Sequence, residues 1–257
     1  EHPENGARLV AIMDHLRDSG LLTRMAPLAA ERASLADLQR IHQPALIERV
    51  RRVAASGGGN LDLDTAVSAR SFEAALFAAG GTIAATRAAL AGQAQRAFAL
   101  VRPPGHHALA RRAMGFCLFN NIAVAAAWAL AEGGVSRLAI VDFDVHHGNG
   151  TQAAFGDDPR VLFASTHQYP YFPGTGDWRD DAPLDRGGHC LNIPLPARTG
   201  DAGYQQAFEQ LIVPAVRRHR PELILVSAGY DAHWADPISW MRASLAGYRL
   251  MADALAA

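Results

Sequence analysis

The chain has 257 residues, 49% of them hydrophobic, and its 24 basic and 25 acidic residues give a net charge of −1. This length and composition predict a globular protein with a sizeable core. The balanced charge gives no electrostatic case for binding nucleic acid or an anionic membrane surface. Cys117 and Cys190 form no CxxC pair and no apolar stretch reaches transmembrane length, so we expect a cytoplasmic protein.

Helical and strand patterns alternate along the chain. Hydrophobic periodicity predicts helices over 6–19, 34–41 (with Ser34 as N-cap), 71–91, 121–131 and 202–219. The glycine-rich segment 56–60 is predicted to be a loop. Short apolar runs predict strands buried on both faces of a parallel sheet at 96–101, 137–143, 160–165 and 222–227. This alternation predicts a doubly wound α/β domain.

Ionisable side chains follow three of these four predicted strands. They are His106 and His107 after the first strand, Asp142, Asp144 and His146 at the end of the second, and Asp231 after the fourth. Taken singly, each histidine is explained as a surface or hydrogen-bonded residue, and each aspartate as a helix N-cap. Ligands of open α/β sheets bind beyond the carboxyl ends of the strands, so the joint placement favours one active site there.

A metal ion is the simplest common cause of this pattern. Asp144 and His146 are two residues apart and point to the same side of an extended chain, and Asp231 closes the site from a neighbouring strand. Three such ligands are typical of catalytic Zn²⁺, although Fe²⁺ and Mn²⁺ suit the same donors. Such a metal lowers the pKa of a bound water to ~7 and polarises a carbonyl group. His106 and His107 are then candidates for the base and acid of a hydrolysis.

Five motifs resemble the zinc-dependent histone deacetylase superfamily, which includes class II-like bacterial histone deacetylases, acetylpolyamine amidohydrolases and acetoin-utilisation proteins. The motifs are RPPGHHA (102–108), MGFCLFNN (114–121), DFDVHHGNGTQ (142–152), YFPGTG (171–176) and SAGYDAH (227–233). The resemblance implies a single arginase/deacetylase-like α/β domain over 1–257, with a mainly parallel central sheet flanked by helices. It implies an amidohydrolase that uses Zn²⁺, or Fe²⁺, and structural K⁺ or Na⁺. The implied substrates are acetyl-lysine peptides or acetylated polyamines and other small amines.

The resemblance also assigns roles to individual residues. It implies zinc ligands at Asp144, His146 and Asp231, catalytic histidines at His106 and His107, and their partners at Asp142 and Asn149. It implies an acyl-lysine channel lined by Gly115, Phe116 and Phe172, and a substrate-binding acid on its rim at Asp64. It implies one monovalent-cation site at Asp142, Asp144, His146, Ser165 and Thr166, and a second at Phe155, Asp158 and Val161.

Two departures from the family pattern affect these expectations. Asn149 stands where class I members carry Asp; an amide orients His107 without stabilising its charge, so we expect His107 to lose its proton more readily than His106. The family's Gly-Gly-Tyr loop does not occur before Ala257, and we expect the family's first strand and C-terminal segment to be missing. A catalytically impaired acyl-lysine-binding homologue is therefore the alternative to an enzyme.

Two features receive no definite role. His147 has no assigned function beyond supporting the loop backbone. Trp178, Trp234 and Trp240 are predicted to line either the mouth of the site or a contact between copies in a homo-oligomer.

Overall fold

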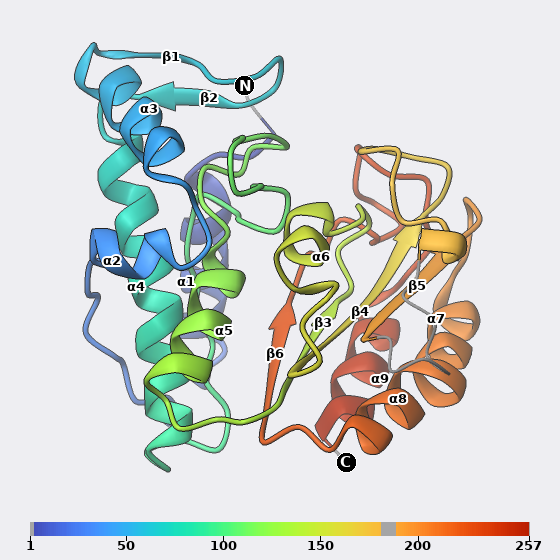
Figure 1. Cartoon of the computed structure of the whole chain (residues 1–257). Helices are drawn as coiled ribbons and strands as arrows, with labels where there is room; N and C mark the ends of the chain where they lie inside the picture. Colours follow the sequence, from blue (N-terminus) through green and yellow to red (C-terminus); the bar gives the residue numbers. More distant parts are fainter. Residues whose placement is uncertain (1–2, 181–188, 257) are drawn as a thin grey trace. The chain divides into compact units, whose positions relative to one another are not determined.

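A computed structural model describes residues 3–180 and 189–256. The chain divides into two compact units, Glu1–Gly133 and Gly134–Ala257 (Figure 1). Among the described residues, every helix is too short or too polar to cross a membrane.

The first unit is mainly helical. Its helices are α1 (Ala7–Asp18), α2 (Leu35–Gln39), α3 (Pro44–Ala55), α4 (Ser71–Leu90) and α5 (Asn121–Ala131), with a short 3₁₀ turn at Leu21–Arg24. Four of the five match the predicted helices, and α3 was not predicted. The Ser34 hydroxyl accepts the Asp37 N–H at 3.0 Å, which confirms the predicted N-cap of α2. The alanine-rich helices α4 and α5 pack against each other (Figure 1).

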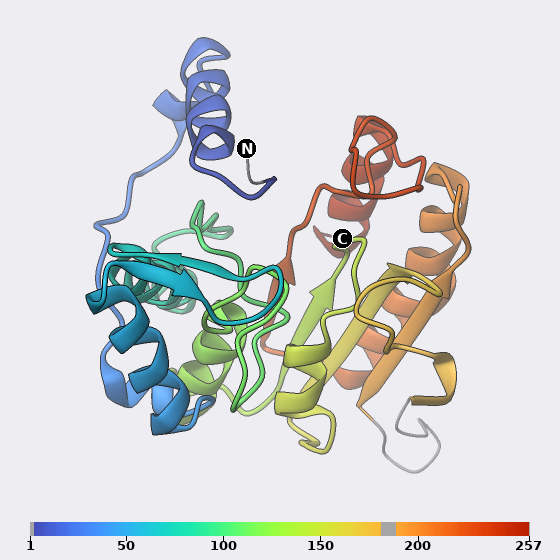
Figure 2. The ribbon, with the colours of Figure 1, turned by 90° about the horizontal axis from the view of Figure 1, so that it is seen from above.

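Two predictions for this unit are wrong. Within the predicted loop 56–60, Gly58–Asn60 forms strand β1, which pairs antiparallel with β2 (Ala66–Ser68; Figure 2). A glycine run carries no alternating apolar pattern, so its strand pairing leaves no signal. Residues 96–101 form no strand, and Phe98 is exposed. An apolar run becomes a strand only where a neighbouring strand offers hydrogen-bond partners, and no described segment pairs with this run.

The second unit contains a four-stranded parallel sheet. Its strand order is β5 (Cys190–Leu195), β4 (Val161–Gln168), β3 (Leu138–Asp142) and β6 (Leu223–Ser227). The order confirms three predicted strands and the expected parallel sheet, but the predicted burial on both faces holds for β3 and β4 and not for β6, in which Val226 is exposed. The unpredicted strand β5 reads CLNIPL, in which Asn192 and Pro194 interrupt the apolar run.

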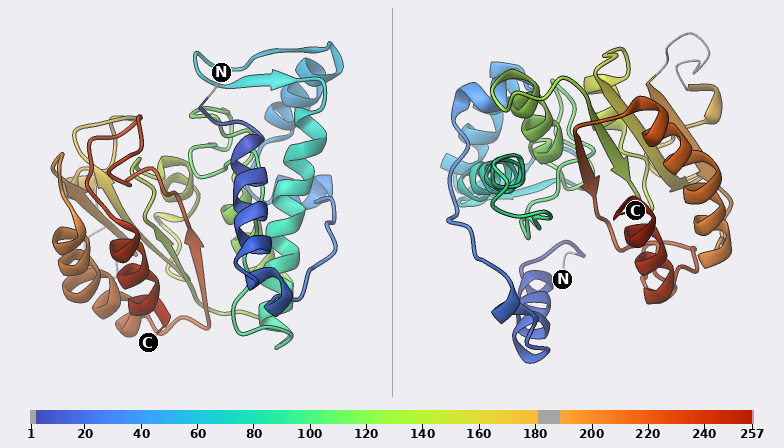
Figure 3. Two further views of the ribbon diagram at one scale, coloured as in Figure 1. Left: turned by 180° about the vertical axis from the view of Figure 1, so that it is seen from behind. Right: turned by 90° about the horizontal axis from the view of Figure 1, so that it is seen from below.

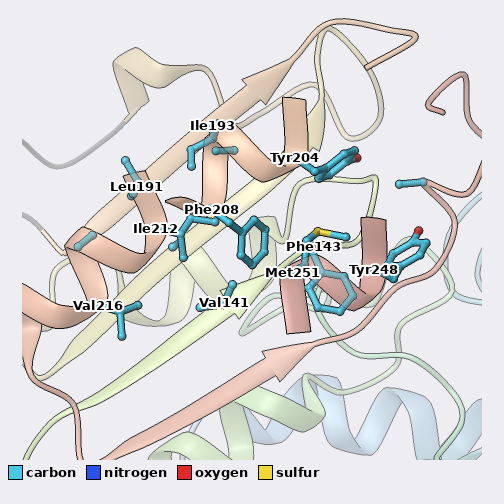
Figure 4. Packing of buried hydrophobic residues seen from close by; sticks show 14 of the residues in the cluster. Val141, Phe143, Leu191, Ile193, Tyr204, Phe208, Ile212, Val216, Tyr248 and Met251 are labelled. Carbon is cyan, nitrogen blue, oxygen red and sulfur yellow. The ribbon is translucent and has the colours of Figure 1, made fainter. Parts of the chain in front are cut away.

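Helices of this unit pack on both faces of the sheet (Figures 2 and 3). On one face, α7 (Asp201–Ala207), a π-helical turn (Phe208–Ile212) and α8 (Val213–His219) form one continuous stretch, which confirms the predicted helix 202–219. This stretch and α9 (Leu245–Ala256) pack a core on β3, β4 and β5 that includes Val141, Ile193, Phe208, Ile212 and Met251 (Figure 4). The short helix α6 (Asn149–Phe155) packs against β4 on the other face.

The sheet register places the candidate ligands together. Asp142, the last residue of β3, is the register partner of Ser227, the last residue of β6. The segments that leave these two neighbouring strands therefore begin side by side. Asp144 and His146 lie on one segment and Asp231 on the other.

Candidate active site

Asp144, His146 and Asp231 form a cluster in which one ligand atom of each lies within 4.8 Å of the others. The His146 Nδ1 atom is 3.0 Å from Asp144 Oδ1 and 2.9 Å from Asp231 Oδ2. Backbone N–H groups orient both carboxylates: His146 donates to Asp144 Oδ1 and Val145 donates to Asp231 Oδ1, each at 2.9 Å. These bonds fix the carboxylate oxygens around the imidazole.

The cluster concentrates charge in a partly buried place. Burial opposes protonation of His146, but the hydrogen bonds and charges of Asp144 and Asp231 outweigh it and raise the His146 pKa to about 10. Burial and the charge of Asp144 raise the pKa of Asp231, an effect that His146 partly offsets. Two carboxylates crowded around one imidazole are stabilised by a cation, and this donor set fits Zn²⁺ or Fe²⁺.

Neighbouring residues pack closely against the side chains of the cluster. A Cβ atom at residue 229 would overlap the Asp144 carboxylate, so Gly229 permits the close approach of the segment after β6. The Tyr171 ring stacks on His146 with centroids 5.6 Å apart, and the Phe172 ring meets it edge-on at 5.9 Å. The Tyr171 hydroxyl donates to the Ile238 carbonyl at 2.7 Å. Phe172, a predicted channel residue, therefore lies beside a candidate metal ligand.

His147 belongs to a buried polar network that the sequence did not reveal. Its Nδ1 lies 2.7 Å from the Thr175 hydroxyl and its Nε2 lies 2.6 Å from Gln152 Oε1. The ring packs on His167 at 4.8 Å between centroids. His167 bonds in turn to the Ser165 hydroxyl and the Gly176 carbonyl, and burial lowers its pKa to about 4. His147 thus ties the 171–176 loop, which carries Tyr171 and Phe172, to α6.

In the first unit, His106 and His107 are buried side by side, with ring centroids 3.9 Å apart. Their loop is tied at both ends: the Asn121 side chain donates to the Pro103 carbonyl at 3.0 Å, and His42 Nδ1 lies 3.0 Å from the Leu109 carbonyl. His42 Nε2 also accepts the Asn120 N–H at 2.8 Å.

These bonds require a neutral His42 that donates at Nδ1 and accepts at Nε2. Burial lowers the His42 pKa to about 4, so the ring is neutral at physiological pH. Sequence reasoning missed this residue because a lone histidine before a helix carries no motif.

The turn at Gly115 and Phe116 packs tightly against the His107 ring. Gly115 and Phe116 both have positive φ, +57° and +66°, and a Cβ atom at residue 115 would overlap the His107 ring. Asp64 Oδ1 accepts the Gly115 N–H and the Thr65 hydroxyl accepts the Phe116 N–H, each at 3.2 Å. The carboxylate predicted as a rim acid therefore anchors this turn. Its contact with substrate, and the channel roles of Gly115 and Phe116, stay predictions.

His106 and His107 belong to one unit and their predicted partners, Asp142 and Asn149, to the other, so both pairings stay predictions. Asp142 is fully buried at the end of β3, and its Oδ1 accepts the Asp144 N–H at 3.1 Å. Asn149 is the first residue of α6.

The chain matches known deacetylases along almost its whole length. The family model described as "Histone deacetylase domain" matches residues 2–257. A "Probable deacetylase" of Archaeoglobus fulgidus is 42% identical, with 97% of this chain aligned to 70% of that protein. A "Histone deacetylase-like amidohydrolase" of Pseudomonas aeruginosa is 44% identical over 98% of this chain and 66% of its own length.

Two further matches extend this comparison. The human "Polyamine deacetylase HDAC10" is 40% identical over 95% of this chain and 38% of its own length. The crystal structure of the HDA15 HD domain superposes with a TM-score of 0.94 at 37% identity, covering 99% of this chain and 73% of that one. The chain belongs to the histone deacetylase family. Its fold is the family's α/β domain with a parallel central sheet flanked by helices.

Proposed function

We propose that the chain is a metal-dependent amidohydrolase that removes acetyl groups from acetyl-lysine in peptides. The observation that carries the proposal is the Asp144–His146–Asp231 cluster, which supplies two carboxylates and an imidazole within 4.8 Å in a chain of the deacetylase family. A divalent ion held there, Zn²⁺ before Fe²⁺, would supply Lewis acidity toward the amide carbonyl and the attacking water.

The tandem histidines perform the proton transfers in this proposal. His107 takes a proton from the attacking water, and an imidazole of the pair protonates the leaving amine as the C–N bond breaks, which yields acetate and a free amine. In this proposal Asp142 is the charged partner that orients His106, whereas the amide of Asn149 orients His107 without adding charge. His107 is therefore the proposed base.

Structural monovalent cations belong to the same proposal. Asp142 and Ser165 are register partners on β3 and β4, which supports a K⁺ or Na⁺ site formed by the backbones of Asp142, Asp144 and His146 with Ser165 and Thr166. The second proposed site uses the turn between α6 and β4. There the Asp158 N–H bonds the Phe155 carbonyl and the Val161 N–H bonds the Asp158 carbonyl.

Replacing His107 tests the function. His107→Ala is expected to lower kcat on an acetyl-lysine peptide by about 100-fold or more while the bound metal is retained. The matched control is His15→Ala, an exposed histidine of α1, which is expected to leave kcat unchanged. Full activity of His107→Ala at normal metal content would overturn the assignment.

Acetylpolyamine hydrolysis is the second candidate, and the name of the human relative favours it. Comparing kcat/KM on an acetyl-lysine peptide and on acetylspermidine separates the two. A higher value on acetylspermidine would replace the peptide with a polyamine as the proposed substrate.

A further inference from the structure

A cleft of about 740 Å³ lies in the second unit, outside the ligand cluster. Two tryptophans and two arginines dominate its lining: Trp234, Trp240, Arg198 and Arg242. Trp234 and Trp240 are 66% and 67% exposed, which is unusual for indole side chains in a folded protein. Exposed aromatic side chains that flank a concave surface are typical of a binding site.

Backbone hydrogen bonds hold the cleft in shape. The Arg198 N–H donates to the Trp240 carbonyl at 2.8 Å, the Arg242 N–H to the Thr199 carbonyl at 2.9 Å, and the Trp234 N–H to the Ala243 carbonyl at 2.9 Å. The three segments that carry these side chains are therefore fixed to one another. A preformed cleft binds a ligand without first ordering its own walls.

The cleft is connected directly to the candidate metal ligands. The Ser239 hydroxyl, in the cleft lining, donates to the backbone carbonyl of Asp231. The Trp240 ring lies 5.8 Å from the Tyr171 ring, which itself stacks on His146. These contacts place the cleft next to the ligand cluster.

The charge of the cleft indicates which type of substrate residue it can bind. No lining residue is acidic, and neither Arg198 nor Arg242 forms an ion pair with an acidic residue among those that the structure describes. Guanidinium groups bind carboxylates through paired hydrogen bonds, and indole faces pack on peptide and side-chain surface. Two guanidinium groups repel the ammonium groups of a polyamine.

We propose that this cleft is a specificity subsite that binds an acidic residue flanking the acetyl-lysine of a peptide substrate. The proposal rests on the proposed function and names its substrate class, an acidic peptide rather than a polyamine. Arg198 and Arg242 supply the charge, and Trp234 and Trp240 supply the surface on which the peptide lies.

Steady-state kinetics on the metal-loaded enzyme test the subsite. The probes are three acetyl-lysine peptides of equal length, flanked by Glu, Gln or Lys. We expect the Glu peptide to have a KM about three- to tenfold below that of the Gln peptide, with equal kcat. Arg198→Gln combined with Arg242→Gln is expected to bring the two KM values within about twofold. Arg217→Gln, an exposed arginine of α8, is the matched control and keeps the preference.

Equal KM values for the Glu and Gln peptides on the unaltered enzyme would overturn the subsite, and so would a preference that survives both arginine substitutions. If the double variant does not fold, a salt titration of the unaltered enzyme decides, because a preference based on exposed charges must shrink as NaCl rises.

A binding measurement separates failure of the subsite from failure of the proposed function. Calorimetry with a Glu peptide in which alanine replaces acetyl-lysine measures the affinity of the cleft for the peptide, because this peptide cannot be hydrolysed. Binding that the two arginine substitutions weaken supports the subsite even if no peptide is hydrolysed, and absence of binding rejects it.

Discussion

The two groups of candidate catalytic residues are held by different physical means. Asp144, His146 and Asp231 follow two paired strands, so the register of a parallel sheet sets their positions. His106 and His107 lie on a loop without a strand, held by hydrogen bonds from His42 and Asn121. Many backbone hydrogen bonds together hold the strands of the sheet in register. The histidine loop is held by a few side-chain hydrogen bonds, so the loss of any one of them matters more. We therefore expect single substitutions to misplace the histidines without disturbing the metal ligands.

Two glycine substitutions should separate the groups most strongly. Gly229→Ala drives a Cβ atom into Asp144 and is expected to lower both metal content and activity, the latter by about 100-fold. Gly115→Ala drives a Cβ atom into His107 and is expected to lower kcat about as much while metal content stays normal. Metal analysis and steady-state kinetics measure both effects. Gly6→Ala is the control, since nothing lies within 4 Å of its added Cβ. Loss of metal in Gly115→Ala would contradict the distinction.

The network around His147 should contribute mainly to stability. His147→Ala leaves Thr175 and Gln152 without their ring partner, and we expect the free energy of unfolding of the metal-free chain to fall by about 3 kcal/mol. A double-mutant cycle with Thr175→Val in urea denaturation is expected to give a coupling of about 1 kcal/mol. Strictly additive effects would show that the ring and the hydroxyl do not interact.

Acid is expected to lower the folding stability of both units, because each contains one buried neutral histidine, His42 in the first and His167 in the second. The pKa values of His42 and His167 are about 4 in the folded chain, below the ordinary 6.5, so the unfolded chain takes up these protons first as pH falls. The contribution is constant above pH 6.5 and is lost between pH 6.5 and 4, by at most about 3 kcal/mol per histidine. Urea denaturation across this range should show a shallower pH dependence for His42→Gln. An unchanged pH dependence would mean that His42 titrates normally.

The smallest expected effect distinguishes two roles of Asp64. If the carboxylate acts by accepting the Gly115 N–H, Asp64→Ala lowers kcat about fivefold, and Asp64→Asn restores it because the amide oxygen can accept the same bond. If Asp64 instead holds substrate by its charge, both variants raise KM. The split between kcat and KM in the two variants decides.

The parts of the fold that could be predicted are those specified by local pattern. Three of the four strands of the sheet are short apolar runs, although only β3 and β4 are buried along their whole length. The ligands follow β3 and β6, so the prediction of a parallel α/β sheet brings Asp144, His146 and Asp231 to one edge. The helix that Ser34 caps and the alanine-rich helix α4 could also be predicted from local sequence.

What could not be predicted depends on contacts between distant segments. The pairing of Gly58–Asn60 with Ala66–Ser68, and the failure of 96–101 to form a strand, are decided by neighbours that a local pattern does not show. His42 bonds a carbonyl 67 residues away, and Asp64 bonds an N–H 51 residues away. Such anchoring residues carry no motif, and only the folded chain identifies them.

The central claim is that Asp144, His146 and Asp231 hold the metal on which hydrolysis depends. The most direct test removes metal from the wild-type chain and from Asp231→Ala, adds back Zn²⁺, and measures bound metal and acetyl-lysine peptide hydrolysis together. We expect the wild type to recover stoichiometric metal and activity in parallel, and Asp231→Ala to recover neither. Tight stoichiometric binding by Asp231→Ala, or full activity of the metal-free wild type, would contradict the claim.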